Sequence, residues 1–322
     1  MLYLKQQCPP PGSLDPRPTT VEKPRATPQE ADWCFRLSLE ARSAWLRAFR
    51  SSVKHLPYAT RLSTCGSNAW VQFSPSTGTY RVLSDRCNLR VCPRCKAGSA
   101  KRIRESLQDA AAFPDPKNTL FLTFTLKHSR RSLAVQLADL LASFRRLRQR
   151  KFWKTSAGSG YAVTEVTWNR NTERWHPHVH VVVNARWIDQ RTLSRLWIQV
   201  TRSSKIVHVR RCDPRQSPAA YLSKYLAKTP ESVLAAGSDR LLEFFDAIKG
   251  RRLLNPFGNV PKISSEREHP CAVTDWQPVA SLMQLFKARD EGDDWATDLL
   301  ALLEKAPDAE RQAFDPRRIE SG

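Results

Sequence analysis

Three histidines alternate along one short segment of the chain. His176, His178 and His180 lie within Trp175-His-Pro-His-Val-His-Val-Val-Val183. Because successive side chains of a β-strand point to opposite faces, the three imidazoles are predicted to share one face and the valines the other. Two imidazoles one residue apart form a natural pair of ligands for a divalent metal. The alternative interpretation is a polar strand face that contacts water.

Pro177 distinguishes among these histidines. Proline cannot donate a backbone hydrogen bond to a neighbouring strand, so Pro177 predicts a sheet edge or the start of a strand. His176 then comes just before the strand. We therefore expect His178 and His180 to be the ligand pair.

A third ligand is predicted from the preceding segment. Tyr161–Trp168 has the pattern of a strand, and Asn169–Arg174 supplies a polar turn before the histidines. Folding this hairpin back sets Glu165 opposite His178 or one register step away. A carboxylate there would complete a site of two histidines and one acidic residue, with open positions for a phosphate oxygen and water. Alternatively, Glu165 is a solvent-facing strand residue.

Two tyrosines occur in a predicted helix further along the chain. Ala219-Ala-Tyr-Leu-Ser-Lys-Tyr-Leu-Ala-Lys228 follows Pro218 and consists of good helix formers. Tyr221 and Tyr225 are four residues apart and share a helix face, flanked by Lys224 and Lys228. A phenol is a weak nucleophile near neutral pH, but nearby ammonium groups favour its phenolate. An amphipathic helix with packed tyrosines is the alternative, and the histidine strand weighs against it.

A cysteine cluster has the spacing of a metal site. Cys87, Cys92 and Cys95 lie close together, and Cys65 lies 22 residues before Cys87. Between them, Trp70–Phe73 and Tyr80–Leu83 read as a hairpin, which gives the layout of a zinc ribbon. Four thiolates leave no open position, so a structural Zn²⁺ is expected. Buried free cysteines are the alternative, and His55 could replace Cys65, the least secure ligand.

Taken in order, these motifs resemble those of one family. The chain is similar to the HUH endonucleases, and among them to the rolling-circle replication initiators (Rep proteins) of small plasmids. The matching segments are Leu120–Leu126, His176–His180, Tyr221–Lys228 and Cys87–Cys95, and the resemblance extends from about Cys65 to Lys228. It does not include the two ends of the chain.

The resemblance implies an α+β fold with a central antiparallel sheet flanked by helices, together with the zinc-ribbon-like module. It implies that Tyr225 attacks single-stranded or cruciform origin DNA, forming a 5′-phosphotyrosine link and a free 3′-OH, and that the strand is rejoined at termination. His178, His180 and Glu165 would hold catalytic Mg²⁺ or Mn²⁺. Host helicase and polymerase machinery are the expected further partners.

One position departs from the plasmid pattern. Some plasmid Rep proteins carry a carboxylate four residues before the nucleophile, where this chain has Tyr221. Two tyrosines are typical of phage initiators and rolling-circle transposases. We therefore expect both tyrosines to act, passing the strand between them. A two-tyrosine transposase, a non-catalytic zinc-ribbon regulator and a water-using metal hydrolase stay open as alternatives.

The composition agrees with a DNA-binding function. Of the 322 residues, 41% are hydrophobic, which excludes a wholly disordered chain. The formal net charge of +21 predicts a polyanionic partner. Segments 96–154 and 199–228 carry net charges of +10 and +6 and flank the histidines. No run approaches the roughly 18 apolar residues of a membrane span, and no apolar signal core is visible, so a cytoplasmic protein without membrane contact is expected.

Five regions are predicted along the chain. A disordered Pro-rich arm at 1–30 precedes a helical segment at 31–59, the zinc-binding module at 60–100 and the HUH nuclease domain at 101–250. A C-terminal segment at 251–322 has an acidic tail, which we expect to be peripheral. A single helix is predicted over Leu234–Ile248. Phe152, Trp153 and Trp197 lie in or near the basic segments. They are predicted to pack in the core, with base stacking as the alternative.

Overall fold

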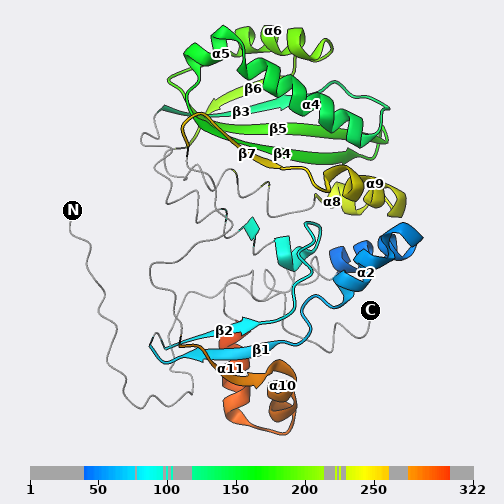
Figure 1. Ribbon diagram of the computed structural model, residues 1–322, viewed down its shortest axis with the longest axis vertical. Coiled ribbons are helices and arrows are strands. Elements are labelled where there is room, and N and C mark those ends of the chain that lie inside the picture. Colours follow the sequence, from blue (N-terminus) through cyan, green and yellow to red (C-terminus); the bar gives the residue numbers. More distant parts are fainter. Residues whose placement is uncertain are drawn as a thin grey trace, which may run out of the picture. The chain divides into compact units, whose positions relative to one another are not determined.

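The computed structural model describes residues 40–76, 78–96, 99–100, 103, 118–213, 222, 225, 230–260 and 275–304. These residues belong to two compact units, whose elements are labelled in Figure 1. The described part of the smaller unit falls within 40–46, 56–95 and 275–304. That of the larger unit falls within 47–55 and 96–260.

The larger unit is built on a five-stranded antiparallel sheet with the order β6-β3-β5-β4-β7. Its strands are β3 (Thr119–Thr125), β4 (Gly160–Asn169), β5 (Arg174–Asn184), β6 (Val207–Arg211) and β7 (Leu254–Phe257). The three histidines therefore lie on the middle strand. This confirms the predicted α+β class with a central antiparallel sheet.

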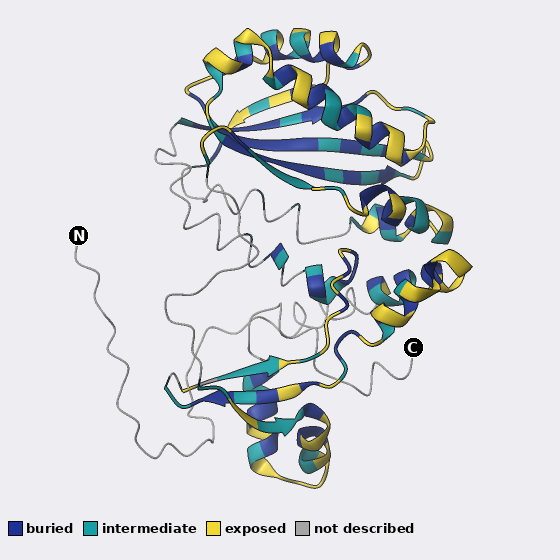
Figure 2. Cartoon of the chain, in the orientation of Figure 1, coloured by how far each residue is buried: buried dark blue, intermediate teal, exposed yellow. Residues whose placement is uncertain are grey.

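Three helices cover one face of this sheet, as Figure 1 shows: α4 (Leu133–Arg148), α5 (Lys151–Ser156) and α6 (Gln190–Thr201). The valines of β5 that alternate with the histidines, Val179, Val181 and Val183, belong to the core beneath the helices. Trp153 and Trp197 are buried in the same core, and Phe152 packs against it. The predicted core packing of these aromatic residues is confirmed, and the buried strands appear dark blue in Figure 2.

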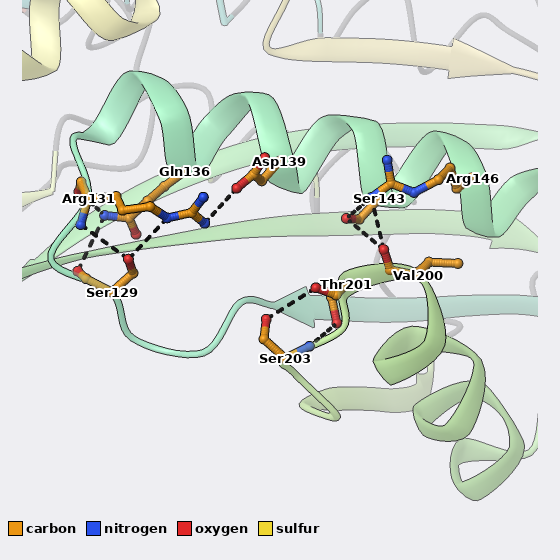
Figure 3. A network of polar contacts seen from close by, with 9 residues as sticks. All are labelled: Ser129, Arg131, Gln136, Asp139, Ser143, Arg146, Val200, Thr201 and Ser203. Atoms are coloured by element: carbon orange, nitrogen blue, oxygen red, sulfur yellow. Dashed lines mark hydrogen bonds and ion pairs between the residues drawn. The ribbon is translucent and has the colours of Figure 1, made fainter.

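Polar contacts attach α4 to its surroundings (Figure 3). Arg146 Nη2 donates to the carbonyl of Val200 at the end of α6, at 2.9 Å, and the hydroxyl of Ser143 donates to the same carbonyl at 3.4 Å. Near the start of α4, Gln136 Nε2 donates to the carbonyl of Arg131 at 2.6 Å. The two bonds to Val200 hold α4 and α6 together on this face of the sheet.

The hairpin between β4 and β5 sets the register of the histidine strand. Asn169 pairs with Arg174, which confirms the predicted turn, and Thr172 N donates to Asn169 Oδ1 at 3.0 Å. At the far end of β4, a Cβ at Gly160 would lie 2.2 Å from the carbonyl oxygen of Val182. Glycine is therefore required where the two strands approach.

The start of β5 differs from the prediction. The strand begins at Arg174, so His176 lies within it rather than before it. The ladder between β3 and β5 ends at the pair Thr125–His178, and Pro177 lies just beyond that end. A proline is tolerated there because the neighbouring strand has already ended, although β5 is the central strand.

The remaining described elements of this unit include the end of a helix over 40–50, the 3₁₀ helix η1 (Val53–His55), α8 (Glu231–Leu234) and α9 (Ser238–Ile248). The helix predicted over Leu234–Ile248 is confirmed over Ser238–Ile248, but its predicted start is wrong, because α8 ends at Leu234. Gly237 separates α9 from α8, because its φ of +91° is outside the helical region and favours glycine.

The smaller unit contains α2 (Leu56–Ser63) and a three-stranded sheet with the order β2-β1-β8. Pairing of β1 (Trp70–Ser74) with β2 (Thr79–Leu83) confirms the predicted hairpin. On its other side, β1 pairs with β8 (Gln277–Ser281), which leads into α10 (Leu282–Asp290) and α11 (Asp294–Glu304).

The C-terminal helices are not peripheral, contrary to expectation. Leu282, Leu285 and Leu299 are buried with Val71 of β1 in one core. Acidic side chains give the segment its charge, but its leucines recur at helical spacing and form an apolar face. The described part of this segment, up to residue 304, thus completes the small sheet unit.

Candidate active site

The predicted metal ligands lie on the sheet face opposite α4. Thr125 of β3, His178 of β5 and Glu165 of β4 form one row across the three strands. His180 lies in the next row, beside Thr123. Of the two registers predicted for Glu165, the structure has the one directly opposite His178.

Two threonines of β3 orient the imidazoles. Thr125 Oγ1 lies 2.9 Å from His178 Nδ1, and Thr123 Oγ1 lies 3.1 Å from His180 Nδ1. The other nitrogen of His180, Nε2, lies 2.9 Å from Glu165 Oε2. Hydrogen bonds to Nδ1 fix a ring and direct its Nε2 outward, as is common for metal-binding histidines. Sequence analysis did not assign a role to either threonine.

The electrostatic environment keeps His178 neutral. Burial, together with the positive charges that His176 and His180 can carry, lowers the pKa of His178 to about 3, while the charge of Glu165 acts in the opposite direction. A neutral imidazole is the form that binds a metal ion. His178 is therefore in the form that can bind a metal ion at neutral pH.

Tyr225 lies directly on this site. Its ring stacks on that of His180, with 3.8 Å between the centroids and 17° between the planes. Phe121 extends the stack, at 5.5 Å from His180 and 6.0 Å from Tyr225. Leu222, three residues earlier, is buried with Phe121 in the apolar cluster on this face. Packing of Leu222 thus accounts for the placement of the tyrosine beside the histidines.

The charges around Tyr225 oppose one another. Burial raises the pKa of its phenol above the ordinary value, and the negative charge of Glu165 adds to this effect. The positive charge of Arg210 lowers the same pKa. The protonated phenol is therefore the resting form, and a nucleophilic role requires further stabilisation of the phenolate. The other predicted residues of this helix, Tyr221, Lys224 and Lys228, lie outside the described residues.

Two basic residues near the site were not singled out in the sequence. Arg210 of β6 places its guanidinium 4.6 Å from the centroid of Phe121. Burial lowers the pKa of the Lys96 amino group to about 7, and the nearby charge of Glu165 opposes that shift. Apolar and polar residues alternate from Val207 to Arg210, and this pattern indicates that Arg210 lies on the strand face opposite the valines. Lys96 follows Cys95, and no local pattern indicates its proximity to Glu165.

His176 has different neighbours from the other two histidines. Its ring stacks on His128 at 4.5 Å and meets His178 edge-on at 4.2 Å. Burial, followed by the charge of His128, lowers the pKa of His176. Within the described residues β3 ends at Thr125, opposite His178, so that no β3 threonine faces His176 as Thr125 and Thr123 face His178 and His180. His176 thus differs from His178 and His180 in its surroundings, and the choice of His178 and His180 as the ligand pair stays a prediction.

The four predicted cysteines come together in the smaller unit. Cys65, Cys87, Cys92 and Cys95 are all buried, and their sulfurs lie within 4.8 Å of one another. Cys65 Sγ is 3.6 Å from both Cys92 and Cys95, and Cys87 is 3.7 Å from Cys95. Sulfurs bound tetrahedrally to one zinc ion at about 2.3 Å would be separated by about 3.8 Å. The cluster could therefore hold a metal such as zinc.

Hydrogen bonds between the thiols of this cluster shift their pKa values in opposite directions. Hydrogen bonding with Cys87 and Cys92 lowers the pKa of Cys65 to about 6, and bonding with Cys65 lowers that of Cys95. The same contacts raise the pKa values of Cys87 and Cys92. Among the described residues, no other group of three or more histidines, cysteines or acidic residues brings its donor atoms this close together.

His55 does not replace Cys65, as one alternative proposed. It lies in the larger unit, where its Nδ1 is 2.9 Å from Ser52 Oγ and its Nε2 is 3.1 Å from Asp246 Oδ1. Phe49 and Phe245 pack around its ring. His55 is thus a buried structural histidine, and Cys65 is the fourth member of the cluster.

Comparison with known proteins assigns the chain to a class. Residues 82–291, more than half of the chain, match the family described as Replication protein. The chain belongs to that family, which confirms the resemblance to plasmid rolling-circle replication initiators.

Three curated relatives carry the name Protein rep. One from Bacillus amyloliquefaciens is 26% identical over 65% of this chain and 72% of its own length. Another, from a Bacillus species, is 24% identical over 65% of this chain and 80% of its own length. A third, from Streptococcus pneumoniae, is 31% identical over 48% of this chain and 52% of its own. These relatives support the assignment as a plasmid replication initiator.

No solved structure gives a significant match. Within the described residues, no helix has the length and apolar character needed to span a bilayer.

Proposed function

We propose that this replication initiator nicks one strand of its plasmid origin through attack by Tyr225. The observation that carries the proposal is the stacking of Tyr225 on His180 at 3.8 Å, beside Glu165 and His178. The proposed nucleophile and the proposed metal ligands thus lie on one sheet face, which supports the proposal. Sequence motifs that lie 45 residues apart, His180 and Tyr225, are brought together by packing.

The proposed reaction is a transesterification. The Tyr225 oxygen bonds to the phosphorus, the bond from phosphorus to the 3′ oxygen breaks, and the DNA is joined to the protein by a 5′-phosphotyrosine. The phenol loses a proton and the departing 3′ oxygen gains one. Phosphodiester energy is conserved in the link, so the reverse step rejoins the strand at termination without ATP. The free 3′-OH primes synthesis.

His178, His180 and Glu165 would hold Mg²⁺ or Mn²⁺. Such an ion, when bound, stabilises negative charge on the phosphoryl oxygens. The chain contributes the orientation of the ligands: Thr125 and Thr123 fix the rings through Nδ1. His180 Nε2 lies 2.9 Å from Glu165 Oε2, and this nitrogen can act as a ligand only in the tautomer in which it carries no proton.

Single-stranded or cruciform origin DNA is the proposed substrate. The net charges of +10 and +6 on segments 96–154 and 199–228 support binding to its backbone, and that binding is expected to weaken with salt. A second nucleophilic role for Tyr221, the recruitment of host helicase and polymerase, and a cytoplasmic location stay predictions. We also infer that the four-cysteine cluster holds a structural Zn²⁺.

A covalent adduct assay tests the proposal. The protein is incubated with single-stranded origin DNA, labelled on the 3′ side of the nick, and Mn²⁺ or Mg²⁺, and the products are separated under denaturing conditions. The proposed chemistry predicts a labelled protein band that requires the metal. Cleavage without an adduct would instead indicate a water-using hydrolase. Binding without cleavage would indicate a regulator.

His178→Ala and His176→Ala form a matched pair for the metal site. We expect His178→Ala to raise the Mn²⁺ concentration needed for half-maximal nicking by at least about 10-fold, since loss of a residue that only supports a metal ligand already costs about 10- to 100-fold in affinity. His176→Ala, which removes the ring stacked on His128, is expected to change it far less. Metal titration of the nicking rate measures both. Equal shifts in the two variants would contradict the assignment of His178.

A further inference from the structure

We infer that Arg210 is a further catalytic residue, whose guanidinium contacts the phosphate that Tyr225 attacks. This inference rests on the proposed function and extends its site to the edge strand β6. The position of Arg210 follows from the register of the sheet. Arg210 pairs with Phe121, and His208, two residues before it, pairs with Thr123 in the row of His180.

The side chain of Arg210 shares a face with the nucleophile. Val207 and Val209 point into the core beneath α4 and α6, so Arg210 points to the other side of the sheet. There its guanidinium lies over Phe121, which forms a stack with His180 and Tyr225. The charge of Arg210 also acts on the Tyr225 phenol, in the direction that favours the phenolate.

This arrangement suits a phosphate. Arg210 remains exposed, and the ring of Phe121 supports one face of its guanidinium while the N–H groups lie around the rim of the plane. A guanidinium retains its charge at any relevant pH and can donate two parallel hydrogen bonds to phosphate oxygens. Negative charge accumulates on those oxygens as the Tyr225 oxygen approaches. A cation held near the phenol therefore stabilises the transition state more than it stabilises the ground state in which DNA is bound.

The neighbouring residue points elsewhere. Arg211 lies at the next position of β6, and its guanidinium is 5.5 Å from the ring of Trp187. Adjacent strand residues face opposite sides, so the two arginines carry the same charge to different environments. The charge of the basic segment is thus divided between two faces, and the geometry assigns the catalytic contact to Arg210.

Single-turnover formation of the covalent adduct tests this inference, with the DNA concentration varied at a fixed metal concentration. Arg210→Gln is expected to lower the rate at saturating DNA by about 100-fold, with a much smaller change in the half-saturating concentration. Arg210→Lys keeps the charge but loses the paired donors, and is expected to recover part of the rate. For Arg210→Ala, added ethylguanidinium is expected to restore adduct formation.

Arg195→Gln is the matched control, because it removes an exposed arginine from α6, on the opposite side of the sheet. It is expected to retain the parent rate. If Arg210→Gln raises only the half-saturating DNA concentration, or retains the saturating rate, the inference is overturned while the proposed function stands. If the parent protein itself forms no adduct, the proposed function fails and the inference fails with it.

Discussion

Replacement of Tyr225 by phenylalanine is expected to abolish the covalent link between protein and origin DNA. The change removes one oxygen atom and retains the ring that stacks on His180 at 3.8 Å. The metal ligands and the DNA-binding residues are unaltered, so DNA affinity should persist. Loss of a nucleophile costs at least about 10⁴-fold in rate in enzymes whose catalytic groups act as a unit. Adduct yield on denaturing gels measures the loss, and fluorescence anisotropy measures the retained affinity.

Two comparisons sharpen this prediction. Tyr161→Phe alters a tyrosine on the same sheet face that is fully buried, and it should retain adduct formation. Tyr221→Phe tests the second predicted nucleophile and is expected to impair strand transfer more than the first nick. If Tyr225→Phe nicked normally and Tyr221→Phe did not, the two roles would be reversed.

Removal of metal from the cysteine cluster is expected to unfold the smaller unit. Binding of a structural zinc ion is worth about 10–16 kcal/mol, as much as or more than the total stability of most domains. Cys92→Ser should therefore leave the chain without bound zinc and eliminate one thermal transition. Elemental analysis and calorimetry measure these two effects.

Cys212→Ser provides the control for the cysteine cluster. Cys212 is buried in the apolar cluster of the larger unit, where burial raises the pKa of its thiol to about 11. That substitution should retain one zinc ion per chain. Full zinc content in Cys92→Ser would contradict the four-cysteine site, and so would a parent protein that contains no metal.

The histidine face could be predicted because its determinants are local. Alternation along β5 places His178 and His180 on one side, and a short hairpin restricts Glu165 to a few registers. The four-cysteine set was likewise predictable from spacing, since thiols have few alternative uses at that density. Pro177 was misread because a strand in the middle of a sheet can still lack a neighbour at one end.

Long-range pairing is what the sequence did not reveal. β8 lies about 200 residues from β1 in the sequence, and no local pattern specifies that the two strands pair. The position of Arg210 depends in the same way on the pairing that brings β6 next to Phe121. That of Lys96 depends on the long-range packing that brings it near Glu165. A count of basic residues finds these side chains but does not separate them from the other basic residues.

Identification of the residue joined to DNA tests the central claim most directly. The adduct formed with origin DNA can be digested with protease and nuclease, and the nucleotide-bearing peptide sequenced by mass spectrometry. The proposed function predicts a 5′-phosphate on Tyr225 after the first nick. A nucleotide on any other residue, or cleavage that leaves no nucleotide on the protein, would contradict it.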